Sequence, residues 1–294
     1  MVVEPLVVGL LLMAALMHAS WNAILKSDQS DRLATFGVIM TTGTLMGLCA
    51  VPFLPLIEPA AWKYLASSVL IHVLYYTFLL KAYSYGDLSH TYPIARGLGP
   101  LLVALVSGRF IGEHLRPQDI LGVLLLSFGL IALAMPLRNV VPKPGSRHGL
   151  ATLFAVLTGF TIAAYIIADG LGVRSAGPTF QHRLSYIAWL CVVEGPWLLV
   201  LAIVLRPGTV WAHLRRTWWR GAIGGVIANV GYGIAIYALV LGPMAHIAAL
   251  RETSVLFGAL MGTLLLGEPF GLRRVAAAFV IVVGLVMMNG PQLI

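Results

Sequence analysis

Charge is scarce in this chain. Charged residues make up 10% of its 294 residues, whereas 59% are hydrophobic. Soluble domains carry about a quarter of their residues as Asp, Glu, Lys and Arg, because a folded surface has to interact with water. The low charge therefore excludes an ordinary soluble protein, and it predicts an integral protein whose first partner is the lipid bilayer.

Cysteine and the common catalytic motifs are also scarce or absent. Cys49 and Cys191 are the two cysteines, and both fall inside apolar stretches, where small buried side chains are a better explanation than a disulfide or a metal site. The sequence has no H-E-x-x-H, no Walker glycine loop, no G-x-S-x-G and no Cys/His metal spacing. We therefore expect no metal, no cofactor and no enzyme, and ATP cannot drive this chain by itself.

Long apolar runs are what the sequence does contain. Each is close to the roughly 20 residues that an α-helix needs to cross a hydrocarbon core. The ten predicted spans are Leu6–Leu25, Ala34–Leu56, Leu65–Tyr85, Leu88–Ile111, Ile120–Leu137, Leu150–Leu171, Leu184–Leu205, Trp218–Leu239, Met244–Leu266 and Val275–Met288. A polar linker at residues 138–148 separates a first unit, 1–137, from a second, 149–294. The prediction is an all-α membrane protein with ten transmembrane helices.

The two units repeat one motif. In the first unit Gly86 is followed by His90, Arg96 and Gly112-Glu113, and in the second Gly242 is followed by His246, Arg251 and Gly267-Glu268. Each pair of equivalent residues is 155 or 156 positions apart. Because each unit has five spans, an odd number, the second unit must enter the membrane upside down. We therefore expect two inverted five-helix repeats, with the functional groups at the seam between them.

The positions of the basic residues matter more than the net charge of +8. Of the 19 basic residues, 12 lie in loops after odd-numbered spans and 5 in loops after even-numbered spans. Basic residues at span ends indicate membrane orientation and not nucleic-acid binding, and the positive-inside rule places both termini in the periplasm if the membrane is a bacterial inner membrane. Arg96 and Arg251 are the two that remain, and both lie near the bilayer midplane.

Two interpretations of these arginines stay open. A midplane guanidinium must face protein or water, so Arg96 and Arg251 either pin helices together, through carbonyls or Glu252, or bind an anionic solute. A carboxylate or phosphate suits the second role, because arginine can bond two oxygens at once and keeps its proton. Glu252 points about 100° away from Arg251 on the same helix, and it is a candidate partner for a substrate ammonium group.

A helix break is expected beside Arg96. Pro100 removes a backbone hydrogen bond in mid-span, and Gly97 and Gly99 allow another chain to approach closely. Many transporters use such a break to expose backbone dipoles to their substrate. The alternative is a kink that only shapes helix packing.

Polar and aromatic side chains recur at helical spacing in several spans. One such stripe is usual in helix packing or in an interfacial aromatic belt, but several at similar depth are typical of cavity walls. Combined with the repeated motif, they give the following candidate substrate-binding residues: His18, Trp21, Asn22, Tyr76, Tyr92, Arg96, Tyr165, Tyr232, His246, Arg251 and Glu252.

These motifs resemble the ten-span EamA-type branch of the drug/metabolite transporter superfamily. The resemblance covers essentially the whole chain, and its most specific points are the segments 82–113 and 238–268, each ending in a Gly-Glu pair. It implies secondary transport of small organic solutes, as in the YddG-type amino-acid exporters, and the superfamily also includes permeases for phosphorylated sugars. The four-span relatives have a glutamate in their first span where this chain has His18 and Asn22, so their mechanism of proton antiport does not carry over.

The sequence therefore predicts an inner-membrane exporter of small amphiphilic metabolites, amino acids including aromatic ones, that works by alternating access. An alternative within transport is a permease or exchanger for phosphorylated or phosphonate metabolites. An alternative of another class is a membrane-embedded enzyme or a sensor. The expected partners are a small-molecule solute and the bilayer, without nucleic acid. With both repeats in one chain, we expect a monomer.

Overall fold

The structure is a computed structural model that describes residues 3–27, 31–86, 88–134, 147–266 and 271–290. All of the regular secondary structure in these ranges is helical. The helices are α1 (Pro5–Ser27), α2 (Arg32–Ala50), the 3₁₀ turn η1 (Val51–Phe53), α3 (Pro59–Tyr85), α4 (Leu88–Val106), the π-helical turn η2 (Ser107–Ile111), α5 (Pro117–Ala134), α6 (His148–Arg174), α7 (Phe180–Glu194), α8 (Pro196–Leu205), α9 (Pro207–Leu241), α10 (Met244–Arg251), α11 (Thr253–Leu266) and α12 (Leu272–Asn289).

The helices follow the predicted spans. Within the described part of the chain, eight helical segments are long and apolar enough to cross a membrane, and a shorter apolar helix covers Pro117–Leu133. The ninth predicted span corresponds to α10 and α11 taken together. The all-α membrane class is therefore confirmed. The linker expected at 138–148 falls almost wholly outside the described residues.

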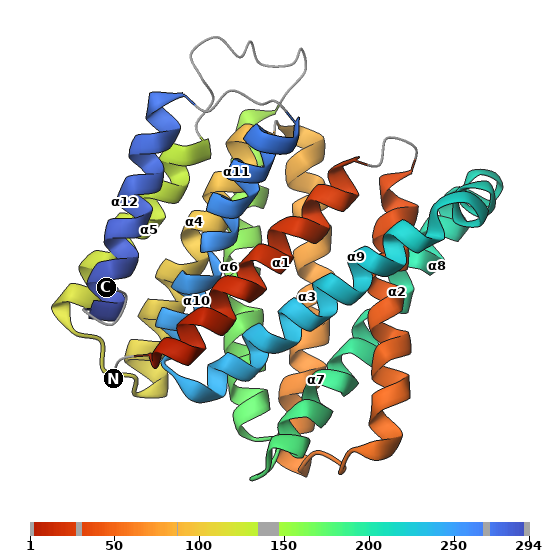
Figure 1. The fold of residues 1–294 in the computed structure, drawn as a ribbon, viewed down its shortest axis with the longest axis horizontal. Helices are drawn as coiled ribbons and strands as arrows, with labels where there is room; N and C mark the ends of the chain where they lie inside the picture. Colours follow the sequence, from red (N-terminus) through yellow and green to blue (C-terminus); the bar gives the residue numbers. More distant parts are fainter. Residues whose placement is uncertain (1–2, 28–30, 87, 135–146, 267–270, 291–294) are drawn as a thin grey trace.

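The two repeats run in opposite directions. In Figure 1, α1 rises from the N-terminus at the bottom of the view, whereas α6 descends from the top. Likewise α5 rises and its counterpart α12 descends to the C-terminus at the bottom. Equivalent helices are thus antiparallel, as an inverted repeat requires.

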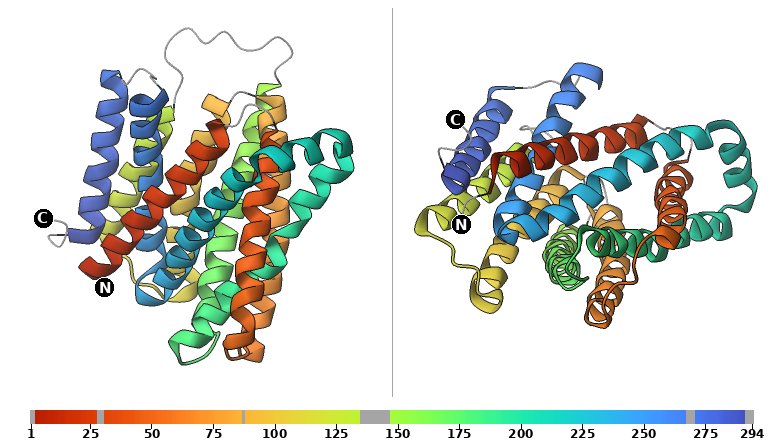
Figure 2. Two further views of the ribbon diagram at one scale, coloured as in Figure 1. Left: turned by 45° about the vertical axis from the view of Figure 1, so that its right-hand side comes forward. Right: turned by 60° about the horizontal axis from the view of Figure 1, so that its bottom comes forward.

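Helices of the two repeats interlock. α1 of the first repeat packs along α9 of the second, α6 of the second packs between α3 and α4 of the first, and α5 packs on α12. Both views in Figure 2 show α1 and α9 side by side. One buried apolar cluster draws residues from both repeats, for example Leu11, Leu126, Ile162 and Ile236. The seam is therefore a packed core in which a buried charge needs a partner.

Glycines let α5 and α12 approach closely. A Cβ built on Gly284 would lie 2.6 Å from the Gly122 carbonyl oxygen and 2.8 Å from the Leu126 nitrogen. A Cβ on Gly129 would lie 2.6 Å from Ile281 Cγ1. Small residues of this kind are typical of helix contacts within membranes, where packing contributes much of the stability.

We expect Gly284→Leu to lower the melting temperature of the detergent-solubilised protein, because the added side chain forces α5 and α12 apart. Overpacking of this kind costs about 1 to 3 kcal/mol. Gly258→Leu is the matched control, since a Cβ on the exposed Gly258 meets nothing within 4 Å. Equal melting temperatures for the two variants would show that the glycine contact is dispensable.

The sequence predicted a helix break in the first repeat, but the structure has one in the second repeat. α4 continues as helix through Gly97, Gly99 and Pro100, so the break that the sequence predicted there is absent. The two glycines serve close packing instead: a Cβ on Gly97 would lie 2.9 Å from Ile131 Cγ1, and one on Gly99 would lie 2.9 Å from Ile162 Cγ2. A proline removes one backbone hydrogen bond, and packing on both sides holds this helix together despite that loss.

The observed interruption is at Glu252, between α10 and α11. The Glu252 N–H donates to the Ala249 carbonyl at 3.1 Å, and the Val255 N–H donates to the Glu252 carbonyl at 3.0 Å. The Thr253 hydroxyl donates to the Leu250 carbonyl at 2.7 Å. These short-range bonds satisfy groups that a regular helix would pair four residues away. Arg251, Glu252 and the hydroxyl groups of Thr253 and Ser254 therefore lie where a membrane-spanning helix is interrupted.

Candidate functional site

An ion pair across the seam neutralises Arg96. Arg96 Nε on α4 lies 3.1 Å from Glu252 Oε2 at the α10–α11 break, and Arg96 Nη2 donates to Ser254 Oγ at 3.0 Å. Both side chains are largely shielded, with 12% and 3% of their surface exposed. Of the two interpretations of Arg96, the geometry supports the pin between helices. It also gives Glu252 a protein partner.

Arg251 is placed differently from its repeat counterpart. Its guanidinium carbon lies 5.4 Å from the centre of the Tyr232 ring, which is a cation–π contact. No carboxylate pairs with Arg251 in the ranges that the structure describes. Arg251 lines a small cavity together with His18, Arg96, Tyr232 and Ser254.

This cavity, which we call the seam cavity, has a volume of about 20 Å³. Its walls come from α1, α4, α9, α10 and α11, and hence from both repeats. A space of this size admits about one water molecule. A metabolite can enter only if the repeats separate, so the structure corresponds to a closed form of the site.

A second polar cluster lies deeper between α3, α6, α7 and α9. The Tyr232 hydroxyl donates to Asp169 Oδ2 at 2.7 Å and lies 3.2 Å from His72 Nε2. His72 Nε2 is in turn 3.4 Å from Glu194 Oε1, and the Tyr76 hydroxyl donates to that same oxygen at 3.4 Å. His72, Asp169 and Glu194 are 4%, 1% and 5% exposed. Tyr232 therefore joins this buried acid–histidine cluster to Arg251.

Aromatic rings surround the seam cavity and the second polar cluster. Tyr165 stacks on His72 with ring centres 4.3 Å apart. Phe36 connects Tyr76, at 5.8 Å, with Trp21, at 5.9 Å. The indole Nε1 of Trp21 donates to His18 Nδ1 at 3.3 Å. The rings thus form a continuous wall from the first helix to the centre of the protein, which suits the apolar part of an amphiphilic solute.

Two of the predicted site residues, His246 and Asn22, are not brought to this wall. His246 lies in another network, 3.4 Å from Asp119 Oδ1 and 3.1 Å from the Met288 carbonyl oxygen. Asn22 is exposed, and its amide donates to the His18 carbonyl of its own helix. The side chain of Tyr92 lies outside the described residues. Seven of the other candidates lie at the seam cavity or along the aromatic wall, and Glu252 lies beside the cavity residue Arg96.

Glu194, His72 and Asp169 were not among the predicted site residues. Glu194 is a single carboxylate in the middle of an apolar span, immediately before Gly195-Pro196, where the chain passes from α7 to α8. The criterion that isolated Arg96 and Arg251 would have found it if acidic residues had been counted as well. His72 and Asp169 belong to polar stripes, but sequence spacing does not show that stripes from different helices meet.

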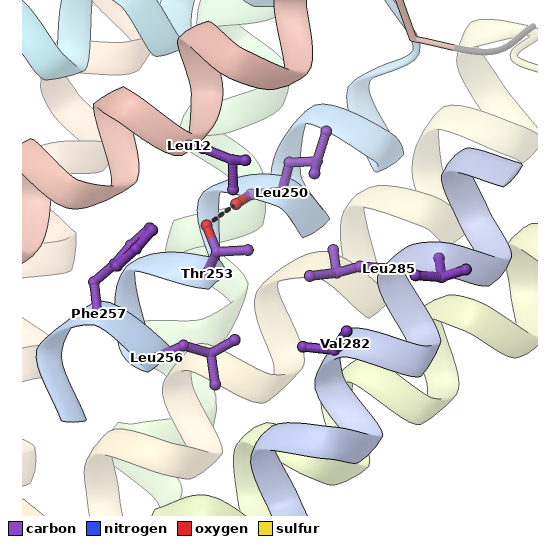
Figure 3. A pocket seen from close by; sticks show the side chains of 8 residues that line it. Leu12, Leu250, Thr253, Leu256, Phe257, Val282 and Leu285 are labelled. Atoms are coloured by element: carbon purple, nitrogen blue, oxygen red, sulfur yellow. Dashed lines mark hydrogen bonds between the residues drawn. The ribbon is translucent and has the colours of Figure 1, made fainter. Parts of the chain in front are cut away.

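A larger apolar pocket of about 290 Å³ adjoins the break between α10 and α11. Figure 3 shows Leu250 and Thr253 beside the break, with Leu256, Phe257 and the α12 residues Val282 and Leu285 around the pocket. It contains no charged group, so it offers no anchor for an ion.

The Gly-Glu motif of the first repeat ties the repeats together at one end. Glu113 Oε2 accepts from the backbone N–H of Met244 at the start of α10, at 2.8 Å. Glu113 Oε1 accepts from Arg174 Nη2 at 3.0 Å, and Arg174 also donates to the Leu239 and Gly242 carbonyls. A carboxylate at a helix N-terminus satisfies a free donor and complements the helix dipole. The equivalent Glu268 lies outside the described residues.

In the described part of the chain, eight long apolar helices, a shorter one at Pro117–Leu133 and the interrupted pair α10–α11 form two inverted sets with buried charges where the sets meet. This arrangement defines a polytopic membrane protein of the inverted-repeat class. A model of the EamA-like transporter family matches residues 5–135 and 149–290. The chain therefore belongs to the EamA-like transporter family, a family of membrane transporters within the drug/metabolite transporter superfamily.

Two individual proteins are similar to this chain. An uncharacterised protein of Pseudomonas aeruginosa is 29% identical over 198 residues, which span 64% of this chain and 61% of that protein. A crystal structure of a protein superposes with a TM-score of 0.73 over 96% of this chain and 98% of the other, at 18% identity. Likeness at that identity shows the fold alone.

Proposed function

We propose that this protein carries small amphiphilic carboxylates, with amino acids including aromatic ones as the best candidates, across a bacterial inner membrane by alternating access. Arg251 binds the carboxylate, and the aromatic wall packs the apolar part. The direction, outward from the cytoplasm, and the periplasmic termini rest on the resemblance to exporters and on the positive-inside count.

One observation carries the choice of solute: Arg251 faces the seam cavity and has no carboxylate partner among the residues that the structure describes, whereas Arg96 is paired with Glu252. The site therefore offers one available guanidinium. A single carboxylate matches that charge, whereas a phosphate monoester carries about −1.5 to −2 at neutral pH. The pairing favours amino acids over the phosphorylated or phosphonate metabolites that two free arginines would serve.

The seam supports alternating access in a direct way. The cavity walls belong to both repeats, and its volume of about 20 Å³ is too small for any metabolite. Separation of the repeats at either end would open the site to one side of the membrane at a time. The Glu113–Arg174 contact holds the two repeats together at the end where α10 begins.

Flux into proteoliposomes tests this function. We expect the purified, reconstituted protein to move labelled amino acids, with phenylalanine among the first to examine, and unlabelled amino acids to compete better than organophosphates. Empty liposomes set the background. An organophosphate that competes better would favour the phosphate alternative, and no flux of either class would contradict the proposal. Chemical conversion of these compounds by the detergent-solubilised protein would instead indicate an enzyme.

A further inference from the structure

The hydrogen-bond partners of His72 fix which of its ring nitrogens carries a proton. Nδ1 lies 2.9 Å from the Ser68 carbonyl oxygen, one turn earlier on α3. A carbonyl oxygen can only accept, so Nδ1 must be the donor. In the neutral ring Nε2 is then a bare acceptor, and it is this nitrogen that faces Glu194 Oε1 at 3.4 Å.

If Glu194 were ionised, two acceptors, Glu194 Oε1 and His72 Nε2, would face each other with no proton between them. The Tyr232 hydroxyl cannot supply that proton, because it already donates to Asp169 at 2.7 Å. Either Glu194 is protonated or His72 is an imidazolium. A neutral carboxyl–imidazole pair costs less at such a buried place than two separated charges do, so the proton belongs on Glu194, which donates it to His72 Nε2.

One further carboxylate and several neutral groups lie beside this pair, whereas the cations lie beyond two of the tyrosines. Asp169 is the second carboxylate, and its two oxygens accept from Tyr232 and, at 3.4 Å, from Tyr186. The neutral titratable groups around the cluster are Tyr75, Tyr76, Tyr165, Tyr186, Tyr232 and the thiol of Cys191. Arg251 is the cation that acts on His72, across Tyr232, and Arg96 and Glu252 reach only as far as Tyr165.

The net charge of the cluster also favours one bound proton. With both carboxylates ionised and His72 neutral, the cluster would carry two negative charges at full burial. One proton on Glu194 halves that charge. Among the described residues no group of His, Cys, Asp and Glu has the arrangement to hold a metal ion.

We propose that Glu194, His72 and Asp169 form a proton-binding site of this transporter, with Glu194 protonated in the closed form and hydrogen-bonded to His72. When the repeats separate, the Glu194 carboxyl O–H bond breaks and water takes up the proton, and the carboxylate regains a proton from water in the reverse step; no other bond changes. Tyr232 contacts both Asp169 and Arg251, so the charge of the cluster and the occupancy of Arg251 influence each other reciprocally. Only this use of the proton in transport rests on the proposed function.

Infrared difference spectroscopy of the protein in lipid vesicles, without any solute, tests the proton site. We expect wild-type protein to show the carbonyl stretch of a protonated glutamate at neutral pH, and to lose it on alkalinisation. Labelling the glutamates with ¹³C should shift this band, and this measurement needs no mutation. Glu194→Gln should lack the band, whereas Glu58→Gln, which changes an exposed carboxylate at the start of α3, should keep it.

Absence of a titrating glutamate carboxyl in the wild type, or its persistence in folded Glu194→Gln, would overturn the proton site. If Glu194→Gln does not fold, the labelled wild type alone decides the question. Because these spectra require no solute, their failure leaves the proposed amino-acid flux intact. A failure of the flux assay equally leaves the spectral result in place.

Discussion

Arg251→Ala is expected to lower the initial rate of amino-acid flux in proteoliposomes by roughly 30-fold or more. Loss of one partner of a shielded, hydrogen-bonded charge pair costs about 2 to 5 kcal/mol, and each 1.4 kcal/mol is about a tenfold change in affinity. The cost falls on binding and not on folding, since Arg251 holds no carboxylate in the described part of the protein. The variant should therefore melt close to the wild-type temperature.

The control for this variant is Arg216→Ala, because Arg216 is an exposed arginine on α9 outside the seam cavity. It should transport at the wild-type rate. Wild-type flux by Arg251→Ala would remove Arg251 as the anchor, and a folded but equally inactive Arg216→Ala would show that the assay reports something other than the cavity.

Arg96→Ala, unlike Arg251→Ala, is expected to lower the stability of the protein. It leaves the carboxylate of Glu252, 3% exposed, without its cation, and removal of one partner from a buried ion pair costs about 3 to 5 kcal/mol. The measurement is the melting temperature in detergent, which should fall well below that of the wild type and of Arg251→Ala.

The double variant Arg96→Met/Glu252→Gln separates a lost pair from a lost side chain. It removes both charges while it keeps similar volumes, so it should recover much of the stability that Arg96→Ala loses. A double variant as unstable as Arg96→Ala, or a fully stable Arg96→Ala, would contradict the role of Arg96 as a pin. The two repeat-related arginines would then have to be regarded as equivalent.

Depth in the membrane could be predicted from the sequence, but contacts between helices could not. Apolar runs locate Arg96 and Arg251 near the midplane because charge is costly there, and the structure places both at the seam. Whether Glu252 meets Arg251, Arg96 or a solute depends on how α4 and α10 are rotated against each other. Nothing in the spacing of a single helix determines that rotation.

The break in the helix shows the limit of local rules. Pro100 predicts a break in α4, yet packing of Gly97 and Gly99 against neighbouring helices keeps that helix continuous. In the second repeat, Glu252 has no proline beside it and still ends α10, because an ion pair and the Thr253 hydroxyl compensate the interrupted backbone. Tertiary contacts overrode the local preference in both repeats.

His246 illustrates the same limit for the repeat itself. Its spacing from His90 marks it as part of the motif, but the structure pairs it with Asp119 and the Met288 carbonyl, between α5, α10 and α12. A motif shared by both repeats can therefore serve the joining of helices as well as solute binding. The side chain of His90 lies outside the described residues.

The central claim is that a solute carboxylate binds Arg251, and equilibrium binding tests it most directly. The binding of L-phenylalanine and of L-phenylalaninamide, which lacks the carboxylate, should be measured by calorimetry on wild-type protein and on Arg251→Ala. We predict that wild-type protein binds the acid at least about 30-fold more tightly than the amide, and that Arg251→Ala binds both equally weakly. Equal affinity of wild-type protein for the acid and the amide would contradict the account.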